Sequence, residues 1–198
     1  MKEENVWKSF PSEHDKYAGW AKRIAELQVE AYRKEFKFNG LHVVRPGNIF
    51  GPYSNFNPKN SMVVSSLIKR VTDGENPLRV WGDGTAVRDF IFSEDVADGM
   101  LNVVKKNIQI PINLGSGKGY SIKKLVHTIC KSEYISSKPK VIFDTSKPSG
   151  DKKRVLDIKK AKIFKLYKIS NFQNSIDKTI LWYKNNTIKT KLRYNFFK

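Results

Sequence analysis

The sequence is poor in metal-binding and disulfide-forming residues, with one cysteine and three histidines among 198 residues. The single Cys130 excludes an internal disulfide, and so few thiols and imidazoles give no Cys/His spacing of the kind that structural zinc sites use. No stretch approaches the roughly 18 to 20 consecutive apolar residues that cross a bilayer, and no apolar signal core follows the charged amino terminus. These absences favour a cytoplasmic protein without a structural metal or a membrane partner.

Acidic residues are scarce in the second half of the chain. Residues 1–100 carry 14 basic and 14 acidic side chains, so the second half holds 23 of the 37 Lys and Arg and only 5 of the 19 Asp and Glu. The net charge of +18 therefore originates after residue 100. Because the lysines occur singly or in pairs and no RNA- or DNA-binding motif accompanies them, we interpret them as solvated surface charge, with a nucleic-acid-binding domain as an alternative. A basic face beside a pocket also favours an anionic substrate such as a nucleotide diphosphate.

The length and a hydrophobic content of 39% predict one globular unit over residues 1–186, followed by a basic tail over 187–198. Short apolar runs alternate with amphipathic segments, which predicts an α/β fold with parallel strand pairing. Pro46-Gly47 is expected to end a strand, residues 48–60 to form a loop, and the turn at 82–84 to close a hairpin. Helices are predicted over 21–36, 62–71, 93–104, 121–130, 157–167 and 175–184, and strands over 41–45, 78–81, 87–92, 111–115 and 140–143.

The glycine-rich segment from Gly115 to Gly119 lies between a predicted strand and a predicted helix, where dinucleotide-binding loops also occur. The fingerprint G-x-G-x-x-G requires a third glycine at position 120, and this chain has Tyr120 there. No suitably placed acidic residue follows about 20 residues later to hold a ribose. We therefore interpret this segment as a tight connection between a strand and a helix.

Five short motifs in order carry a family resemblance. They are Tyr-Ala-Gly-Trp-Ala-Lys at 17–22, Arg-Pro-Gly-Asn at 45–48, Trp-Gly-Asp-Gly at 81–84, Arg-Asp-Phe-Ile at 88–91 and Asn-Leu-Gly at 113–115. This order resembles the carboxyl-terminal portion of the NAD(P)-dependent epimerases and dehydratases of the extended short-chain dehydrogenase/reductase superfamily. The later segment 143–157 is most similar to the GDP-L-fucose synthase-like nucleotide-sugar enzymes. The resemblance covers about residues 5–185 and implies a Rossmann-type fold with a small substrate-binding subdomain.

The resemblance implies an enzyme that uses NAD or NADP and passes hydride to or from a sugar carbon of a nucleotide-diphosphate sugar. It also implies that the dinucleotide-binding units and a catalytic serine or threonine precede Met1, so this chain alone is expected to be inactive. The expected protein partner is a second copy of the chain or a separately encoded amino-terminal half. The alternative is a catalytically silent fragment that binds nucleotide sugars.

The resemblance implies a catalytic tyrosine and a lysine one helical turn later. A phenol with a pKa of about 10 needs a neighbouring cation to exchange protons near neutral pH. Lys22 matches the family lysine, but Ala18 stands four residues before it, and the nearest phenol, Tyr17, stands five residues before it. Residues five apart on a helix lie about 140° apart around its axis. Tyr17 is therefore expected to serve only if it precedes the first helical residue, and otherwise to pack at the helix entry.

Further site residues follow from the same resemblance. Lys22 and the Pro46–Gly47–Asn48 backbone are expected to meet the nicotinamide end of the cofactor, unless this turn is only structural. Arg88 is expected to grip the substrate diphosphate, because a guanidinium binds phosphate oxygens bidentately. The alternative for Arg88 is an ion pair with Asp89 or Asp95. The remaining substrate-binding candidates are Asn60, Trp81, Lys147 and Arg154.

Position 62 bears on the type of reaction. Met62 stands where the resemblance implies the histidine that protonates the sugar in fucose synthases, and a thioether cannot transfer a proton. The sequence therefore favours reductase, 4-epimerase or dehydratase chemistry over 3,5-epimerisation.

Overall fold

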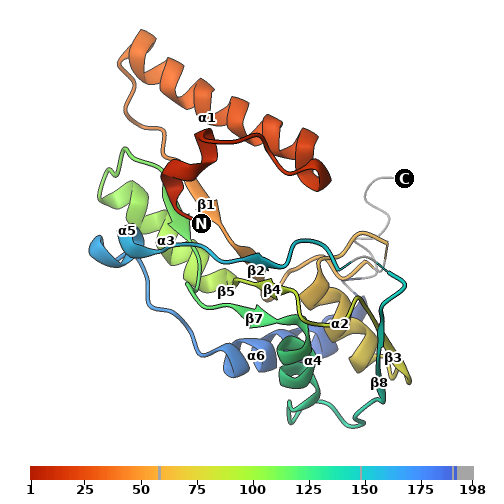
Figure 1. Ribbon diagram of the computed structural model, residues 1–198. Coiled ribbons are helices and arrows are strands. Elements are labelled where there is room, and N and C mark those ends of the chain that lie inside the picture. The colour runs from red at the N-terminus through yellow and green to blue at the C-terminus, as the bar shows by residue number, and fades with distance from the viewer. Residues whose placement is uncertain (58, 148, 189, 191–198) are drawn as a thin grey trace.

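The computed structural model describes residues 1–57, 59–147, 149–188 and 190, and it confirms the predicted α/β class (Figure 1). Two short 3-10 helices, η1 and η2, precede the first α-helix. The α-helices are α1 (Lys16–Phe36), α2 (Val63–Thr72), α3 (Ser93–Lys105), α4 (Ile122–Cys130), α5 (Lys159–Ile163) and α6 (Phe172–Asn185). The strands are β1 (Val44–Pro46), β2 (Asn48–Phe50), β3 (Leu78–Trp81), β4 (Val87–Arg88), β5 (Phe90–Phe92), β6 (Ile112–Leu114), β7 (Tyr120–Ser121), β8 (Val141–Asp144) and β9 (Lys153–Arg154).

Parallel pairing dominates, as expected. β1 pairs with β6, β2 with β5 and β3 with β8, all in parallel. β4 lies between β7, which is antiparallel to it, and β9, which is parallel. The predicted hairpin at residues 82–84 is wrong, because β3 and β4 enter different sheets. The two φ-positive glycines of this turn, Gly82 and Gly84, instead lie against Ser149 and Phe143 of the β8 region.

The expected strand end at Pro46-Gly47 is confirmed to within one residue, because β1 includes Pro46 and ends there. Pro46 is in register with Leu114, and the Gly47 N–H donates to the Leu114 carbonyl at 2.8 Å. Successive N–H groups point to opposite sides of a strand, so the missing N–H of Pro46 lies on the side away from β6, where it interrupts no hydrogen bond. The chain then enters β2 directly, so residues 48–50 are a strand and the loop begins at Gly51.

Two hydrophobic clusters form the interior. The first joins α2, α4 and α6 to the sheets, and its largest buried side chains include Phe50, Phe56, Phe90 and Tyr183. Phe172 of α6 stacks on the Tyr120 ring at a centroid distance of 4.1 Å. The second cluster packs α3 and α5 around β6, with Ile112 and Leu114 fully buried. Helix α6 therefore closes one side of the fold and α3 with α5 the other (Figure 1).

Helix α1 stands outside both clusters. It has no buried residue and lies above the rest of the fold in Figure 1. Polar contacts attach it: Arg45 donates from Nε and Nη2 to the two Glu26 carboxylate oxygens at 2.7 and 2.6 Å, and Arg33 donates to the Gln109 and Leu41 carbonyls. Its helical repeat gathers large apolar side chains on the surface opposite Glu26, the outward stripe, which consists of Tyr17, Trp20, Ile24, Leu27 and Ala31.

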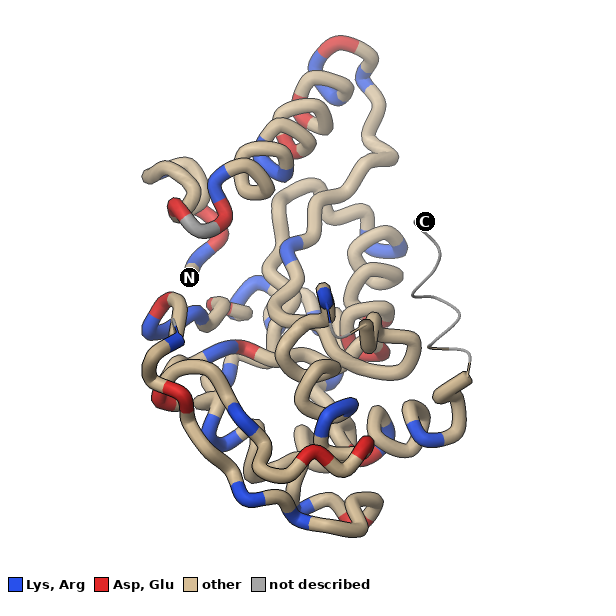
Figure 2. Tube along the Cα trace, turned by 90° about the vertical axis from the view of Figure 1, so that its right-hand side faces the viewer, with Lys and Arg blue, Asp and Glu red and all other residues tan. Residues whose placement is uncertain are grey.

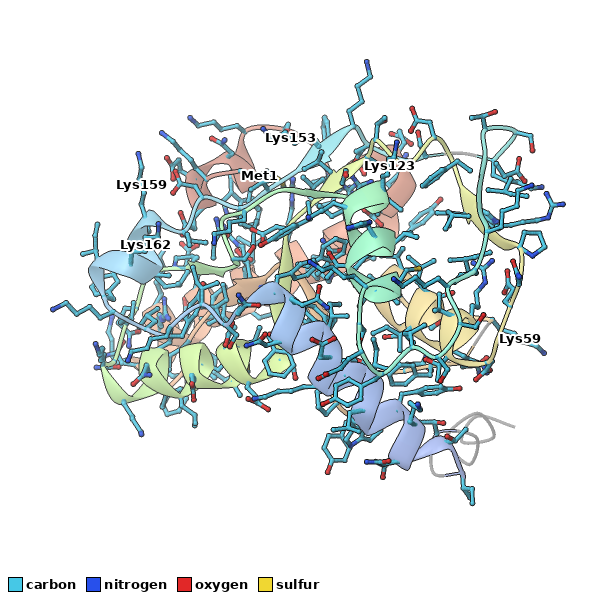
Figure 3. The ribbon with its side chains drawn as sticks, turned by 90° about the horizontal axis from the view of Figure 1, so that it is seen from below. Met1, Lys59, Lys123, Lys153, Lys159 and Lys162 are labelled. Carbon is cyan, nitrogen blue, oxygen red and sulfur yellow. The ribbon has the colours of Figure 1, made fainter. Side chains whose placement is uncertain are left out.

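None of the described helices is long and apolar enough to span a membrane. The predicted tail at 187–198 lies mostly outside the described residues. Lys and Arg occur throughout the described fold (Figure 2). The lysines labelled in Figure 3 are spread from Lys159 and Lys162 at one end to Lys59 at the other, as expected of solvated surface charge.

The Glu26–Arg45 pair gives a test of how α1 is held. Both side chains are about 15% exposed, so removing the carboxylate in Glu26→Ala leaves a largely buried guanidinium unpaired. We expect Glu26→Ala to lower the free energy of opening of α1 by about 3 kcal/mol, measured by amide hydrogen exchange of residues 16–36. Glu30→Ala, which breaks an exposed pair with Lys34, is the control and should change this free energy far less. Equal exchange in the two variants would contradict this account.

Candidate functional site

Arg88 and Arg154 lie side by side on β4 and β9, where the strand register makes them direct partners. The Arg88 guanidinium donates from Nη1 to the Val87 carbonyl at 2.9 Å and to the Asp151 carbonyl at 2.6 Å. Burial lowers the pKa of Arg88, and the neighbouring Arg154 charge lowers it further, while Asp151 opposes both effects. Two guanidinium groups at this spacing attract an anion with several oxygens.

The alternative ion pair for Arg88 is not formed. The Asp89 carboxylate accepts from Ser116 and Gly117, and the Asp95 carboxylate accepts from Ser170. Across the described part of the chain, the ion pairs include none to Arg88. A Cβ at Gly150 would lie 3.2 Å from Nη2 of Arg88, so this glycine leaves the backbone close to the guanidinium. Arg88 therefore has a half-buried charge that forms no ion pair among the described residues, and the nearby Asp151 carboxylate is paired with Arg154.

Arg154 is more fully engaged. It forms ion pairs with Asp151 and, at 2.7 Å, with Asp15, and it donates to Ser12 Oγ at 3.1 Å. Although burial opposes the charge, the hydrogen bonds to Asp15 and Asp151 raise the pKa of Arg154 above its usual value. An anion that binds Arg154 must therefore compete with these carboxylates. An anion that binds Arg88 breaks no existing ion pair.

Of the other predicted substrate-binding residues, Trp81 and Lys147 lie on segments that adjoin the loop before Arg154, whereas Asn60 lies elsewhere. Trp81 is 65% exposed at the end of β3, and Asp144 opposite it begins the segment that carries Lys147. A Cβ at Gly82 would lie 2.8 Å from Ser149, so this strand end adjoins the loop before Arg154. Asn60 instead accepts from the Asn55 side chain at 2.8 Å and lines a separate cleft.

That cleft lies beyond the carboxyl end of β2 and has a volume of about 440 Å³. Met62 lines it and is 59% exposed, so no proton donor stands at this position. Tyr53 adds a phenol, and its ring lies 4.8 Å from that of Trp182 on α6. The residues that line the cleft are Ile49, Pro52, Tyr53, Ser54, Asn55, Asn60, Met62, Ser65 and Ser93. The sequence predicted Asn60 but missed Tyr53, Ser65 and Ser93, although Tyr53 belongs to the loop predicted over residues 48–60.

The structure separates Tyr17 from Lys22. Helix α1 begins at Lys16, so Tyr17 is helical, and the condition under which it was expected to reach Lys22 is not met. At about 100° per residue, Ala18 shares the face of Lys22, whereas Tyr17 lies on the outward stripe, about 140° away. The Tyr17 side chain is 86% exposed.

The polar groups of Gly47 and Asn48 in the turn at 46–48 already form hydrogen bonds within the protein. Gly47 donates to the Leu114 carbonyl, and Asn48 donates from its backbone N–H and from Nδ2 to the Asp89 carbonyl at 2.9 and 3.0 Å. The Asn48 side-chain amide thus links β2 to Asp89. This contact is the one expected if the turn at 46–48 is only structural. Pro46 is exposed on the side away from β6.

The Gly115–Gly119 loop has the N–H arrangement of an anion site, but its anion is internal. Ser116 and Gly117 donate their backbone N–H groups to the Asp89 carboxylate at 2.8 and 3.1 Å, and Gly115 donates to the Tyr167 hydroxyl at 2.9 Å. These donors are therefore unavailable to a phosphate. This agrees with the interpretation of the loop as a structural connection. Within the described residues, no group of three or more His, Cys, Asp or Glu side chains could hold a metal.

The fold and the arginine pair define a Rossmann-type enzyme class, and comparison with known proteins agrees. The model of the "NAD dependent epimerase/dehydratase family" matches residues 3–115. The chain therefore belongs to the NAD-dependent epimerase/dehydratase family.

Similar proteins include the GDP-L-fucose synthase of Sinorhizobium fredii, 35% identical over 140 residues that make up 68% of this chain and 44% of that protein. The GDP-L-fucose synthase of Escherichia coli is 28% identical over 83% of this chain and 55% of its own length. A crystal structure of a GDP-L-fucose synthetase from Naegleria fowleri bound to NADP superposes with a TM-score of 0.85 at 25% identity, over 95% of this chain and 61% of that one. The chain thus spans about half the length of the curated relatives it matches.

Tyr167 supports the loop from its other side, and its titration is testable. Burial raises the pKa of Tyr167 to about 12, although its hydrogen bond with Gly115 opposes this. Because the folded-state pKa is raised, the neutral phenol stabilises the fold fully below the ordinary value of about 10, and this contribution is lost as the pH rises through 12. We expect Tyr167→Phe to show a lower Tm at pH 8 and a smaller loss of Tm between pH 10 and 12 than the unsubstituted protein. Tyr17→Phe, at an exposed phenol, is the control; parallel alkaline curves for all three proteins would contradict this prediction.

Proposed function

We propose that this chain is the substrate-binding part of a NAD(P)-dependent nucleotide-sugar epimerase or reductase. The observation that carries the proposal is Arg88, a half-buried guanidinium beside Arg154 that forms no ion pair among the described residues. A diphosphate supplies such a partner and matches the two guanidinium groups in charge and number of oxygens. The names of the similar proteins support this class, since they are GDP-L-fucose synthases, a GDP-L-colitose synthase and a dTDP-4-dehydro-6-deoxy-D-allose reductase.

The proposed placement of the substrate follows the strand ends. The diphosphate binds at Arg88 and Arg154, with Trp81 and Lys147 on the nucleotide side. The sugar is assigned to the cleft that Asn60, Met62 and Tyr53 line. Met62 supports a reductase, 4-epimerase or dehydratase reaction rather than 3,5-epimerisation, because no residue at that position can protonate a sugar carbon.

The cofactor proposed for the complete enzyme is NAD or NADP, and this chain fits only part of it. Lys22 is exposed on α1, and Lys22 with the Pro46–Asn48 turn is proposed to meet the nicotinamide ribose. The glycine-rich loop cannot hold the cofactor diphosphate, because Asp89 and Tyr167 already occupy its N–H groups. When bound, the nicotinamide would exchange hydride with a sugar carbon. Turnover thus requires phosphate-binding residues beyond those described.

A second candidate is a catalytically silent module that binds nucleotide sugars. Tyr17 favours it, because this phenol lies on the outward stripe of α1 while Ala18 occupies the position that shares a face with Lys22. Both candidates predict nucleotide binding. Turnover of a GDP- or UDP-sugar by the chain together with a dinucleotide-binding half would support the enzyme, and binding without turnover would support the module.

Arg88 provides the main test. We expect Arg88→Met to weaken binding of GDP on the order of 30-fold, because charge-assisted hydrogen bonds to phosphate are lost. Isothermal titration calorimetry of the chain with GDP, UDP and their sugars measures this. Arg79→Met, at an exposed arginine on β3, is the matched control and should bind as the unsubstituted chain does. Equal affinity of Arg88→Met and Arg79→Met would remove Arg88 from the site.

The partner is proposed to dock on the outward stripe of α1, and we infer that it is a second copy of this chain. In an antiparallel pair of α1 helices centred between Ala25 and Glu26, Trp20 faces Ala31 and Ile24 faces Leu27. The large Trp20 then meets the small Ala31, Ile24 and Leu27 form an apolar pair, and Lys16 lies opposite Glu35. A separately encoded amino-terminal half is the other possible occupant.

Light scattering after size exclusion tests this partner. We expect the unsubstituted chain to be a dimer and Ile24→Lys with Leu27→Lys to be a monomer with an unchanged Tm, because neither side chain is buried in the fold. The control is Met100→Lys with Leu101→Lys, at exposed positions on α3, which should leave the dimer intact. A monomeric unsubstituted chain would contradict self-association and would favour the separate half.

A further inference from the structure

Asp89 is the most buried charged side chain in the structure, at 1% exposure, and it follows Arg88 directly. Its carboxylate accepts four hydrogen bonds: from Ser116 N at 2.8 Å, Ser116 Oγ at 2.6 Å, Gly117 N at 3.1 Å and Leu156 N at 3.2 Å. A buried carboxylate is costly unless such donors surround it. The loop after β6 and the segment after β9 therefore converge on one side chain.

The peptide groups of Asp89 join two further strands. Its N–H donates to the Arg154 carbonyl at 3.0 Å, and its carbonyl accepts from Asn48 N and Nδ2. A Cβ at Gly115 would lie only 2.6 Å from the Asp89 carboxylate, so glycine is required there. Asp89 thus contacts Asn48 on β2 and Arg154 on β9, and it directly follows Arg88 on β4.

We propose that Asp89 is a positioning residue for the nucleotide-sugar site: its carboxylate fills the N–H groups of the 116–117 loop and thereby fixes Arg88 and Asn48 relative to each other. This inference rests on the proposed function. Asp89 does not reach the ligand, because the residue is 1% exposed and its carboxylate oxygens are held by donors of Ser116, Gly117 and Leu156. It acts by holding the strand that carries Arg88 against three neighbouring segments.

Asp89→Asn tests this contact directly, because it keeps the size of the side chain and changes only its hydrogen-bonding groups. One carboxylate oxygen accepts from Ser116 N and Oγ and the other from the N–H groups of Gly117 and Leu156, so in either orientation the amide nitrogen of asparagine opposes at least one backbone N–H. The shape is kept while at least one acceptor interaction is lost. Ser116→Ala is a milder variant that removes the Oγ hydrogen bond to Asp89 together with the longer contacts of Oγ with Lys118 at 3.2 and 3.3 Å.

The test is a double-mutant cycle with GDP binding as the readout. We expect Asp89→Asn to raise the Kd for GDP on the order of tenfold and Ser116→Ala to raise it less. In Arg88→Met, adding Asp89→Asn should raise the Kd no further, because the effect of Asp89 on the ligand passes through Arg88. Titration at a temperature well below the Tm of every variant, checked by circular dichroism, keeps unfolding out of the comparison.

Asp95→Asn is the matched control. Asp95 is also buried, at 5% exposure, and accepts from Ser170 N and Oγ at 2.9 and 2.5 Å, but it touches no predicted ligand residue. We expect it to lower the Tm and leave the Kd unchanged. If Asp89→Asn is too unstable to titrate, the cycle is run with Ser116→Ala and Arg88→Met.

The possible results separate the two proposals. If the unsubstituted chain binds no nucleotide, the proposed function fails. If it binds GDP and Arg88→Met weakens binding, but Asp89→Asn and Ser116→Ala bind as the unsubstituted chain does, only the positioning role is overturned. Additive losses in the cycle, or an equal loss in Asp95→Asn, would also overturn it, because they indicate a general effect of destabilisation.

Discussion

The hydrogen bonds of Asp89 are the contact on which the arrangement of the site depends. This residue lies between β4 and β5, and its donors and acceptors come from β2, from the loop after β6 and from Arg154 and Leu156 at the carboxyl end of β9. The sheets are short, and none has more than three strands. Hydrogen bonds between paired strands therefore do not fix the positions of the separate sheets relative to one another. The buried Asp89 carboxylate connects them, because several segments donate hydrogen bonds to it.

Side-chain periodicity predicted most of the helices and strands, but it did not predict which strands pair with each other. The helices at 62–71 and 93–104 and the strand at 78–81 agree with α2, α3 and β3, because local amphipathic patterns specify them. The hairpin at 82–84 failed, since glycines with positive φ also occur where a chain passes close to another segment, as Gly82 and Gly84 do. The strand at 87–92 is interrupted at Asp89, whose side chain turns into the interior between two sheets, and no local pattern indicates this.

The sequence predicted the positions of some site residues but not their hydrogen-bond partners, again because those partners come from distant parts of the chain. Arg88 followed from a motif and from the chemistry of guanidinium groups, and the structure leaves it without an ion pair in the described region. Arg154 was predicted too, but its contacts with Asp15 and Ser12 come from more than 130 residues away along the chain. Asn48 was assigned to the cofactor, yet its amide bonds to Asp89. Such long-range partners depend on the tertiary fold, so residue type alone could not show which polar groups were already satisfied.

Recognition and catalysis have different structural support in this chain. Arg88 and Arg154 are paired across β4 and β9, and the cleft lies beside elements that pack into the first hydrophobic cluster, so their geometry is set by the fold of the chain itself. Lys22 and Tyr17 lie on a helix that touches the fold through a few polar contacts and buries no residue. A partner that covers the apolar stripe of α1, as proposed above, would add to the Arg45 and Arg33 contacts that hold this helix and would thereby affect the geometry around Lys22. Under the proposed function, binding of a nucleotide is a property of the chain, whereas proton transfer on α1 is a property of an assembly.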